Sequence, residues 1–150
     1  MFFKKKSKEL ELLSKANIKP NSNLTSKEEV IKTLGQMLVD TGYVGAEYVN
    51  GMLEREESFS TYMGCGLAIP HGVEKVKNQV KISGLAVMTF PNGVSWGEED
   101  AKIVVAIASK GEEHLEILSN ISEKIIDEEI SQKLINGDVD TIYNILTGKG

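Results

Sequence analysis

The sequence predicts an α/β fold in one domain, from two residue patterns and the length of the chain. Apolar residues recur at helical spacing in several segments, the first of which runs from Lys27 to Thr41. Other segments are short, unbroken apolar runs, and the run from Ile103 to Ile107 is typical of a central strand covered on both faces. A chain of 150 residues is long enough to bury one core. We therefore expect residues 1–150 to form a single domain in which helices pack against strands.

The composition is that of a globular protein, with 41% hydrophobic and 26% charged residues. The net charge of −5 argues against a broad nucleic-acid interface, because such binding depends on clustered Lys and Arg. The single cysteine, Cys65, cannot form an internal disulfide, and no apolar run approaches the length of a membrane span. Residues 1–10 are basic, lack the apolar segment of a signal peptide, and are expected to fray. These features predict a cytoplasmic protein without membrane insertion.

In the first half of the chain we expect a strand followed by two helices. A short apolar patch from Leu12 to Ile18 suits an opening strand. Ser26 and Glu29 form a capping box at the start of the helix that ends near Thr41. A second helix is predicted from Ala46 to Glu57. Its expected apolar face consists of Tyr48, Val49, Met52 and Leu53.

Two strands are predicted in the middle of the chain. The first runs from Val80 to Phe90 and should end at the turn formed by residues 91–93. A loop over residues 96–100 then leads to the strand at residues 103–107. Trp96, within this loop, is expected to be partly buried and not to act as a platform for a ligand.

The last part of the chain is predicted to be helical. After Gly111, apolar residues repeat at spacings of three and four, and Asp127 can cap a further helix that extends to about Ile135. Residues 136–138 interrupt the pattern before a final helix. The apolar residues are Leu115, Leu118, Ile121 and Ile125 in the first of these helices and Val139, Ile142 and Leu146 in the last.

One short stretch carries the strongest signs of chemistry. The apolar run from Leu67 to Ile69 ends at Pro70, and His71 then lies between this proline and Gly72, which is typical of a strand ending in a tight loop. Pro70 restricts the backbone and Gly72 relaxes it, so the imidazole should be presented on a stiff support. Such a histidine can serve as a nucleophile or a metal ligand, and a plain surface-loop histidine is the alternative.

Two further residues could supply positive charge or donors to the same chemistry. Arg55 continues the apolar face of its helix as a charge, whereas Glu54, Glu56 and Glu57 should be solvated. The alternative is an arginine that only extends its charge into solvent from a helix end. His114 is expected in the first turn of a helix, where backbone N–H groups favour a phosphate; otherwise it is an incidental first-turn residue.

Three stretches, in this order along the chain, resemble the IIA components of the sugar phosphotransferase system, in the mannitol and fructose class. Residues 52–56 followed by 60–62 resemble the family's arginine-bearing helix end. Residues 66–72, Gly-Leu-Ala-Ile-Pro-His-Gly, are similar to its phosphorylation motif, and residues 108–118 are similar to its second-histidine segment. The resemblance runs from roughly Leu12 to Leu146, and the Glu-His-Leu sequence around His114 favours the mannitol branch.

The resemblance implies a mixed β-sheet flanked by helices on both faces and a phosphotransferase that forms a phosphohistidine. His71 would accept a phosphoryl group on Nε2 from the histidine phosphocarrier protein and pass it to a cysteine in the IIB domain of a mannitol IICB transporter. Arg55 and His114 would stabilise the charge of the transferring group. No metal or cofactor is expected, because such transfers depend mainly on positioning and charge stabilisation. Lys75 and Lys77 would add a positive rim.

Alternatives to the mannitol phosphocarrier remain open from the sequence alone. A regulatory IIA-like protein of the nitrogen-related phosphotransferase branch would keep the His71 motif but act by binding targets. A fructose-class IIA would differ in its sugar. A zinc protein using Cys65, His71 and His114 lacks the usual ligand spacing, and closed zinc sites usually need four ligands. Neither the oligomeric state nor the exact partner surfaces follow from the sequence.

Overall fold

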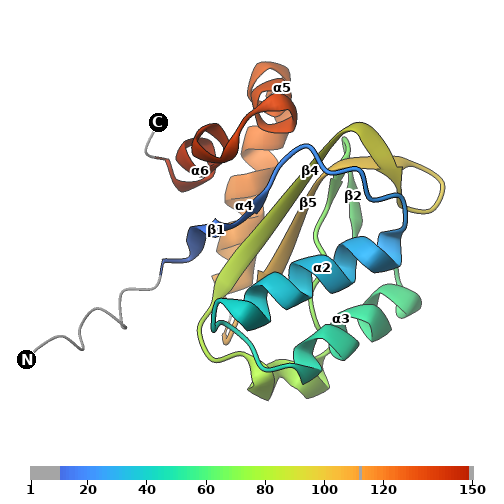
Figure 1. Cartoon of the computed structure of the whole chain (residues 1–150), viewed down its shortest axis with the longest axis vertical. Helices are drawn as coiled ribbons and strands as arrows, with labels where there is room; N and C mark the ends of the chain where they lie inside the picture. Colours follow the sequence, from blue (N-terminus) through green and yellow to red (C-terminus); the bar gives the residue numbers. More distant parts are fainter. Residues whose placement is uncertain (1–10, 112, 149–150) are drawn as a thin grey trace, which may run out of the picture.

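A computed structural model describes residues 11–111 and 113–148, without the side chains of residues 113 and 114 (Figure 1). One five-stranded mixed sheet has the order β1, β4, β5, β3, β2. The strands are β1 (Leu13–Lys19), β2 (Tyr62–Gly64), β3 (Leu67–Ala68), β4 (Gly84–Ser95) and β5 (Asp100–Ala108). The helices are α2 (Lys27–Asp40), α3 (Glu47–Ser58), the 3₁₀ helix η1 (Glu74–Gln79), α4 (Glu113–Ile126), α5 (Glu128–Asn136) and α6 (Val139–Thr147). The expected frayed segment, residues 1–10, lies outside the described residues.

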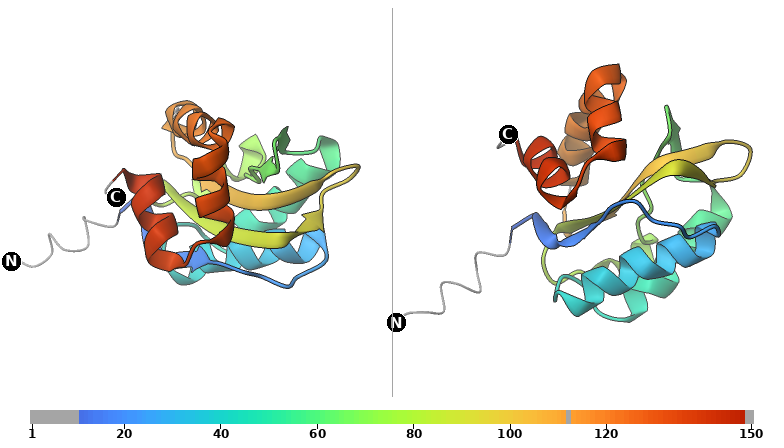
Figure 2. Two further views of the ribbon diagram at one scale, coloured as in Figure 1. Left: turned by 90° about the horizontal axis from the view of Figure 1, so that it is seen from above. Right: turned by 45° about the horizontal axis from the view of Figure 1, so that its top comes forward.

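The sheet separates two hydrophobic cores, one on each face. Helices α2 and α3 cover one face, and α4, α5 and α6 lie on the other (Figures 1 and 2). Successive side chains of a strand point to opposite faces, so β4 sends Ala86 and Met88 into one core and Leu85 and Val87 into the other. The predicted α/β class, with a mixed sheet flanked by helices on both faces, is therefore confirmed.

Two of the predicted helix starts are confirmed by side-chain caps. The Ser26 hydroxyl accepts a hydrogen bond from the Glu29 backbone N–H at the start of α2, over 3.3 Å. The Asp127 carboxylate accepts one from the Ile130 N–H at the start of α5, over 3.1 Å. These caps satisfy backbone donors that the first turn of a helix leaves without an internal partner. Local sequence therefore sets where these helices begin.

The strand predicted from Val80 to Phe90 has different limits in the structure. It begins at Gly84 and continues through the expected turn to Ser95; Val80 forms only an isolated bridge to Val44. The pairing of β4 with β5 shifts register between Thr89 and Val94, so the residues around Pro91 are accommodated as an irregularity within the strand. The prediction that a turn ends the strand at residues 91–93 was wrong.

Trp96 is more buried than expected, and the short strand β2 was not predicted. Trp96 is 2% exposed, so it belongs fully to the core under α2 and α3 and is not merely partly buried. Strand β2 has only three residues, which is too short for an alternating pattern to reveal it. It pairs with β3 and forms the edge of the sheet next to the loop of His71.

A first prediction concerns Gly51, in the interior of α3. Alanine normally stabilises a helix interior by about 1 kcal/mol relative to glycine. At Gly51, however, an added Cβ would lie 2.3 Å from Cγ2 of Val76 in η1. We expect Gly51→Ala to lower the free energy of unfolding by about 1–3 kcal/mol, as overpacking does, in urea titrations.

The matched control makes the same change in a chain with Val76→Ala, which removes the two methyl groups that a Cβ at position 51 would meet. In that background only the Cβ of residue 76 remains close, at 3.1 Å, so Gly51→Ala should be much less destabilising than in the unchanged protein, because most of the overlap is gone and the helix propensity of alanine offsets the rest. A stabilising effect of Gly51→Ala in the otherwise unchanged protein would contradict close packing between α3 and η1.

Candidate functional site

His71 lies on a backbone segment that leaves β3 and continues beside β5. Strand β3 pairs in parallel with β5, and His71 extends this pairing through an isolated bridge to Ile107. The backbone N–H of Ile107 donates to the Pro70 carbonyl oxygen over 2.9 Å. The histidine lies at the end of an apolar run, as the Pro-His-Gly pattern predicts, and the sheet itself holds it there.

The imidazole of His71 is oriented by a carbonyl group of its own segment. Nδ1 lies 2.9 Å from the backbone carbonyl oxygen of Ile69. A carbonyl oxygen can only accept, so this hydrogen bond requires the proton on Nδ1. In the neutral ring, Nε2 then carries the lone pair. This tautomer suits nucleophilic attack through Nε2.

Tyr48 fixes the backbone on the other side of His71. Its hydroxyl donates to the Ile107 carbonyl oxygen and accepts from the Gly72 N–H, each over 2.9 Å. Burial raises the pKa of Tyr48 above its ordinary value, while the bond from the Gly72 N–H acts in the opposite direction. The hydroxyl therefore stays protonated and can make both bonds at neutral pH.

The sequence indicated only that Tyr48 belongs to an apolar helix face. Its ring is indeed buried, at 4% exposure, but its hydroxyl belongs to the site. The sequence could have suggested this role, because a tyrosine on a buried face needs a partner for its O–H.

Gly72 also has a different role from the one expected, because it does not adopt a positive φ. A Cβ there would lie 2.7 Å from the Tyr48 ring, so glycine is required for space.

Arg55 and His71 line the same pocket, which has a volume of about 360 Å³. The pocket also includes Tyr48, Ile69 and Ile107, so the backbone supports of the histidine form part of its wall. Arg55 is half-buried, and its Nη1 donates to the Phe59 carbonyl oxygen over 2.8 Å. The structure therefore brings two of the three predicted site residues together.

The third predicted residue, His114, is the second residue of α4, and its side chain lies outside the described part of the structure. Its predicted place in the first turn of a helix is confirmed for the backbone. Gly111 and Leu118, which precede and follow it in the sequence, both line the pocket of His71. The beginning of α4 therefore borders the pocket.

The expected positive rim is largely neutralised by acidic neighbours. Lys75 Nζ lies 3.3 Å from a carboxylate oxygen of Glu54, and Lys77 Nζ lies 3.6 Å from one of Glu74. All four side chains are well exposed, so these pairs stabilise the fold little but do reduce the local positive potential. Arg55 is therefore a better candidate than Lys75 or Lys77 for binding an anion in the pocket.

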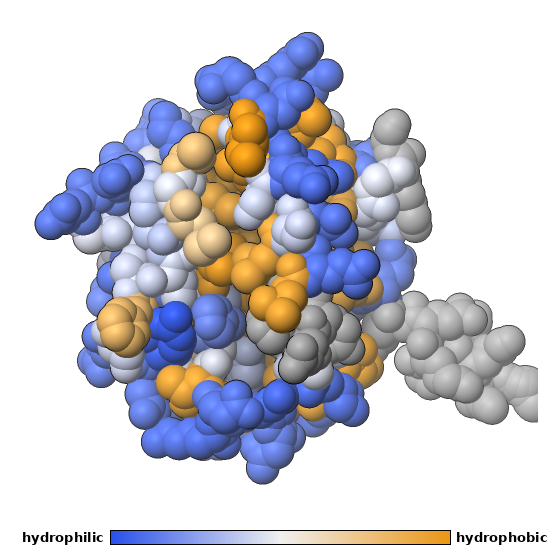
Figure 3. Space-filling view, turned by 180° about the vertical axis from the view of Figure 1, so that it is seen from behind, coloured by the Kyte–Doolittle hydropathy of each residue, from blue (hydrophilic) through white to orange (hydrophobic). Residues whose placement is uncertain are grey.

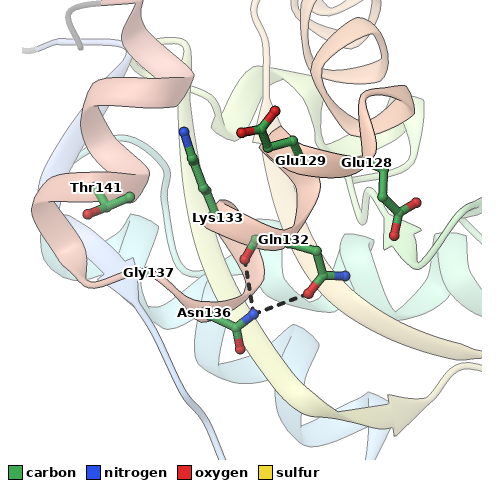
Figure 4. A pocket seen from close by; sticks show the side chains of 7 residues that line it. All are labelled: Glu128, Glu129, Gln132, Lys133, Asn136, Gly137 and Thr141. Atoms are coloured by element: carbon green, nitrogen blue, oxygen red, sulfur yellow. Dashed lines mark hydrogen bonds between the residues drawn. The ribbon is translucent and has the colours of Figure 1, made fainter.

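A larger, open depression lies between α5 and α6, with a volume of about 740 Å³ (Figure 4). The side chains of Glu128, Glu129 and Lys133 lie at its edge and do not converge on one point. Asn136 donates within its own helix, to the carbonyl and side-chain oxygens of Gln132. This depression offers neither a nucleophile nor a cluster of donors, so the pocket of His71 is the candidate site.

Neither a metal centre nor a membrane-spanning helix is found in the part of the chain that the structure describes. The described side chains contain no group of three or more His, Cys, Asp or Glu residues that could hold a metal ion. Within the same residues, no helix combines the length and apolar character needed to cross a bilayer.

The family of the chain follows from its match to a family model. Residues 11–149 match the model for the phosphoenolpyruvate-dependent sugar phosphotransferase system, EIIA 2. The chain belongs to the EIIA 2 family. It is therefore a phosphotransferase component of this system, and the resemblance seen in the three sequence stretches is confirmed.

Individual relatives of this EIIA 2 protein agree with the family match. It is 46% identical over 140 residues to the mannitol-specific phosphotransferase enzyme IIA component of Bacillus subtilis. This match covers 90% of this chain and 98% of the relative. The mannitol-specific enzyme IIA component of Halalkalibacterium halodurans is 46% identical over 125 residues, covering 83% and 86% of the two chains.

A solved structure of a related complex shares the fold of this EIIA 2 protein. It is an NMR structure of the complex of enzyme IIAMTL and phosphorylated enzyme IIBMTL from Escherichia coli. The matched chain is 34% identical with a TM-score of 0.84, and the match covers 91% of this chain and 99% of that chain.

A second prediction concerns the Tyr48 hydroxyl. Tyr48→Phe keeps the buried ring but leaves the Gly72 N–H and the Ile107 carbonyl without this partner. We expect a loss of about 1–3 kcal/mol in the free energy of unfolding at pH 7, measured by urea titration, as for other unsatisfied buried groups.

The pH dependence provides the control for this assignment. The raised folded-state pKa of Tyr48 contributes stability that is complete below about pH 10 and is lost as the pH rises through the folded pKa. The Phe variant lacks this group, so the stability gap between the two proteins should narrow above about pH 10. A constant gap across the alkaline range would argue against a buried, hydrogen-bonded hydroxyl.

Proposed function

We propose that this EIIA 2 protein carries phosphoryl groups in mannitol uptake, with His71 as the residue that is phosphorylated. The observation that carries the proposal is the pocket shared by His71 and Arg55, in which the Ile69 carbonyl holds the imidazole in the tautomer suited to attack through Nε2. Mannitol as the sugar is supported by the Bacillus subtilis and Halalkalibacterium halodurans relatives, both described as mannitol-specific. These names favour mannitol over the fructose-class and nitrogen-related alternatives.

In the first transfer, His71 takes the phosphoryl group from a phosphohistidine of the histidine phosphocarrier protein. The Nε2 lone pair attacks phosphorus, a new N–P bond forms, and the old N–P bond breaks with its electron pair returning to the donor ring. In the second transfer, the thiolate of the IIB cysteine attacks the same phosphorus atom, and the electron pair of the broken bond returns to Nε2. The Nδ1 proton stays on the ring throughout, hydrogen-bonded to the Ile69 carbonyl.

Arg55 and His114 stabilise the charge on the phosphoryl oxygens during both transfers. Arg55 lies in the pocket of His71, and a guanidinium can offer two parallel donors to phosphate oxygens. His114 belongs to the beginning of α4, whose flanking residues Gly111 and Leu118 border the same pocket. Positioning and charge stabilisation supply most of the catalysis in phosphoryl transfer, so the proposed mechanism uses no metal or cofactor.

The donor and the IIB domain dock on one face, because each must bring its reactive atom in line with Nε2 of His71. Seen from behind, the molecule has a hydrophobic area surrounded by hydrophilic residues (Figure 3). Exposed apolar residues lie close to the site in sequence: Phe59 beside Arg55, at 74% exposure, and Leu115 in the first turn of α4, at 57%. An apolar centre with a polar rim suits transient docking. The IIB partner is supported by the Escherichia coli complex of enzyme IIAMTL with phosphorylated enzyme IIBMTL.

Residues 1–150 then act as one IIA-type phosphocarrier domain in the cytoplasm. The domain assignment is supported by the family match over residues 11–149. The cytoplasmic location is supported by the exposed thiol of Cys65, since unpaired, exposed thiols suit a reducing compartment.

A third prediction tests the phosphorylated residue. His71→Ala should abolish labelling by phosphorylated carrier protein, because the nucleophile is removed, whereas His114→Ala should still be labelled at His71. Mass spectrometry of the labelled proteins identifies the modified residue. Label on the His71→Ala protein, or label mapped to His114, would show that the assignment is wrong.

The same assay tests the sugar. The labelled protein should transfer its phosphoryl group to a mannitol IIB domain much faster than to a fructose IIB domain used at the same concentration. Equal rates, or a preference for the fructose domain, would contradict the mannitol assignment while leaving phosphorylation of His71 intact.

A fourth prediction tests the proposed charge stabilisation. Arg55→Ala and His114→Ala should each slow transfer by about 10²–10³-fold, equivalent to about 2.7–4 kcal/mol, by analogy with the removal of one donor to a transition state. Rapid-quench measurements at saturating phosphorylated carrier protein provide the rates. Lys75→Ala is the matched control, because Lys75 is exposed and paired with Glu54. Wild-type rates in the Arg55 and His114 variants would rule out their roles.

A further inference from the structure

Glu56 follows Arg55 directly in the sequence, and its environment is opposite to the one expected. The sequence pattern predicted a solvated glutamate, but Glu56 is only 7% exposed, so that prediction was wrong. Its carboxylate accepts hydrogen bonds from the Thr61 N–H over 3.0 Å and from the Thr61 hydroxyl over 2.6 Å. It also accepts one from Trp96 Nε1 over 3.0 Å and lies 3.7 Å from Lys27 Nζ.

A buried carboxylate is retained only when its charge and its oxygen atoms are well satisfied. Here three donors and one cation surround Glu56, and they come from α2, from the segment before β2, and from the turn between β4 and β5. The end of α3 is therefore fixed against three other parts of the fold. Glu56 is not among the described residues that line the pocket of His71, so it would not touch a phosphoryl group there.

A continuous series of hydrogen bonds connects Glu56 to the imidazole of His71. Glu56 binds both the N–H and the hydroxyl of Thr61. The Thr61 carbonyl oxygen accepts from the Ile69 N–H over 3.0 Å. The Ile69 carbonyl oxygen lies 2.9 Å from His71 Nδ1, which is the bond that selects the ring tautomer. A shift of Thr61 would thus move the acceptor that orients the imidazole.

Glu56 also limits the position of Arg55. Its bonds to Thr61 close the short segment between the end of α3 and β2. At the start of that segment, Arg55 Nη1 donates to the Phe59 carbonyl oxygen, and the Phe59 N–H caps the end of α3 by donating to the Arg55 carbonyl oxygen. The guanidinium is therefore bonded to one end of a short segment whose other end, Thr61, is bonded to Glu56.

We infer that Glu56 is a positioning residue for phosphoryl transfer, acting through Thr61 and Ile69 on the His71 imidazole and through the segment of residues 59–61 on Arg55. The inference rests on the proposed role of His71 as the phosphorylated residue. Its physical basis is that small displacements of reacting groups lower the rate by large factors. A buried carboxylate whose hydrogen bonds are all made can therefore raise the rate by keeping His71 and Arg55 in place. Glu56 would have only a structural role if the His71 imidazole and the Arg55 guanidinium kept their positions after its removal.

The experiment compares four variants by two measurements. The first measurement is the tautomer of His71, from nitrogen chemical shifts of ¹⁵N-histidine-labelled protein under conditions where the ring is neutral. The second is the single-turnover rate of phosphoryl transfer from saturating phosphorylated carrier protein. The variants are Glu56→Ala, Glu56→Gln, Trp96→Phe and Thr61→Val.

Glu56→Ala should lower the saturating rate by about 10–100-fold and raise the population of the Nε2–H tautomer, because the Ile69 carbonyl is no longer held in place. Glu56→Gln should retain the wild-type rate and tautomer. Its amide oxygen can accept from the Thr61 N–H and Trp96 Nε1, and its amide group can donate to the Thr61 hydroxyl oxygen.

Trp96→Phe is the matched control for stability. It removes one donor to Glu56 but does not interrupt the path from Glu56 through Thr61 to His71. The protein should be less stable, yet its tautomer and saturating rate should stay those of the wild type. Thr61→Val removes one of the two bonds from Thr61 to Glu56, and should shift the tautomer in the same direction as Glu56→Ala even if the latter fails to fold.

The inference is overturned if Glu56→Ala leaves both measurements unchanged, or if Trp96→Phe changes them as much as Glu56→Ala. In the case where Glu56→Ala does not fold, an unchanged tautomer in Thr61→Val overturns it. Failure of the proposed function is seen separately, because wild-type protein would then take up no phosphate on His71. The tautomer measurement needs no phosphate and still tests whether Glu56 orients the ring.

Discussion

The backbone of Ile107 is the constraint on which the site depends. Its N–H binds the Pro70 carbonyl oxygen, and its carbonyl oxygen binds the Tyr48 hydroxyl, which in turn accepts from the Gly72 N–H. The residues on both sides of His71 are thereby fixed to one residue of β5. Strand β5 is an inner strand of the sheet and packs into both cores. The backbone around His71 is therefore held rigidly, because its hydrogen-bond partner belongs to a closely packed, buried strand.

The parts of the fold that local sequence controls were predictable. The caps of Ser26 and Asp127 act on backbone groups three residues away, so the helices they begin could be located from the sequence. The limits of β4 could not, because they depend on how its residues pair with β5, a property of two segments together. In the same way, Pro70 and Gly72 indicated that His71 is presented, but not that its support is a neighbouring strand.

The site residues that sequence reasoning missed all depend on distant partners. Tyr48 bonds a residue 59 positions away, and Glu56 bonds Trp96, 40 positions away. Helical periodicity placed both side chains on α3 but could not say what faces them. Arg55 and Glu56 are adjacent in sequence, and only the packing of Trp96 and Thr61 reveals that the carboxylate is the more buried of the two. The role of the His114 side chain stays a prediction.

The hydrogen bond between His71 Nδ1 and the Ile69 carbonyl has a consequence for how a loaded carrier differs from an empty one. In the proposed transfer, a phosphoryl group on Nε2 leaves the proton on Nδ1 and its acceptor unchanged. The hydrogen bond that orients the ring is therefore the same before and after the proposed transfer. Such a protein resembles a passive shuttle more than a switch, and the direction of flow through it is set by the phosphorylation potentials of the molecules on either side.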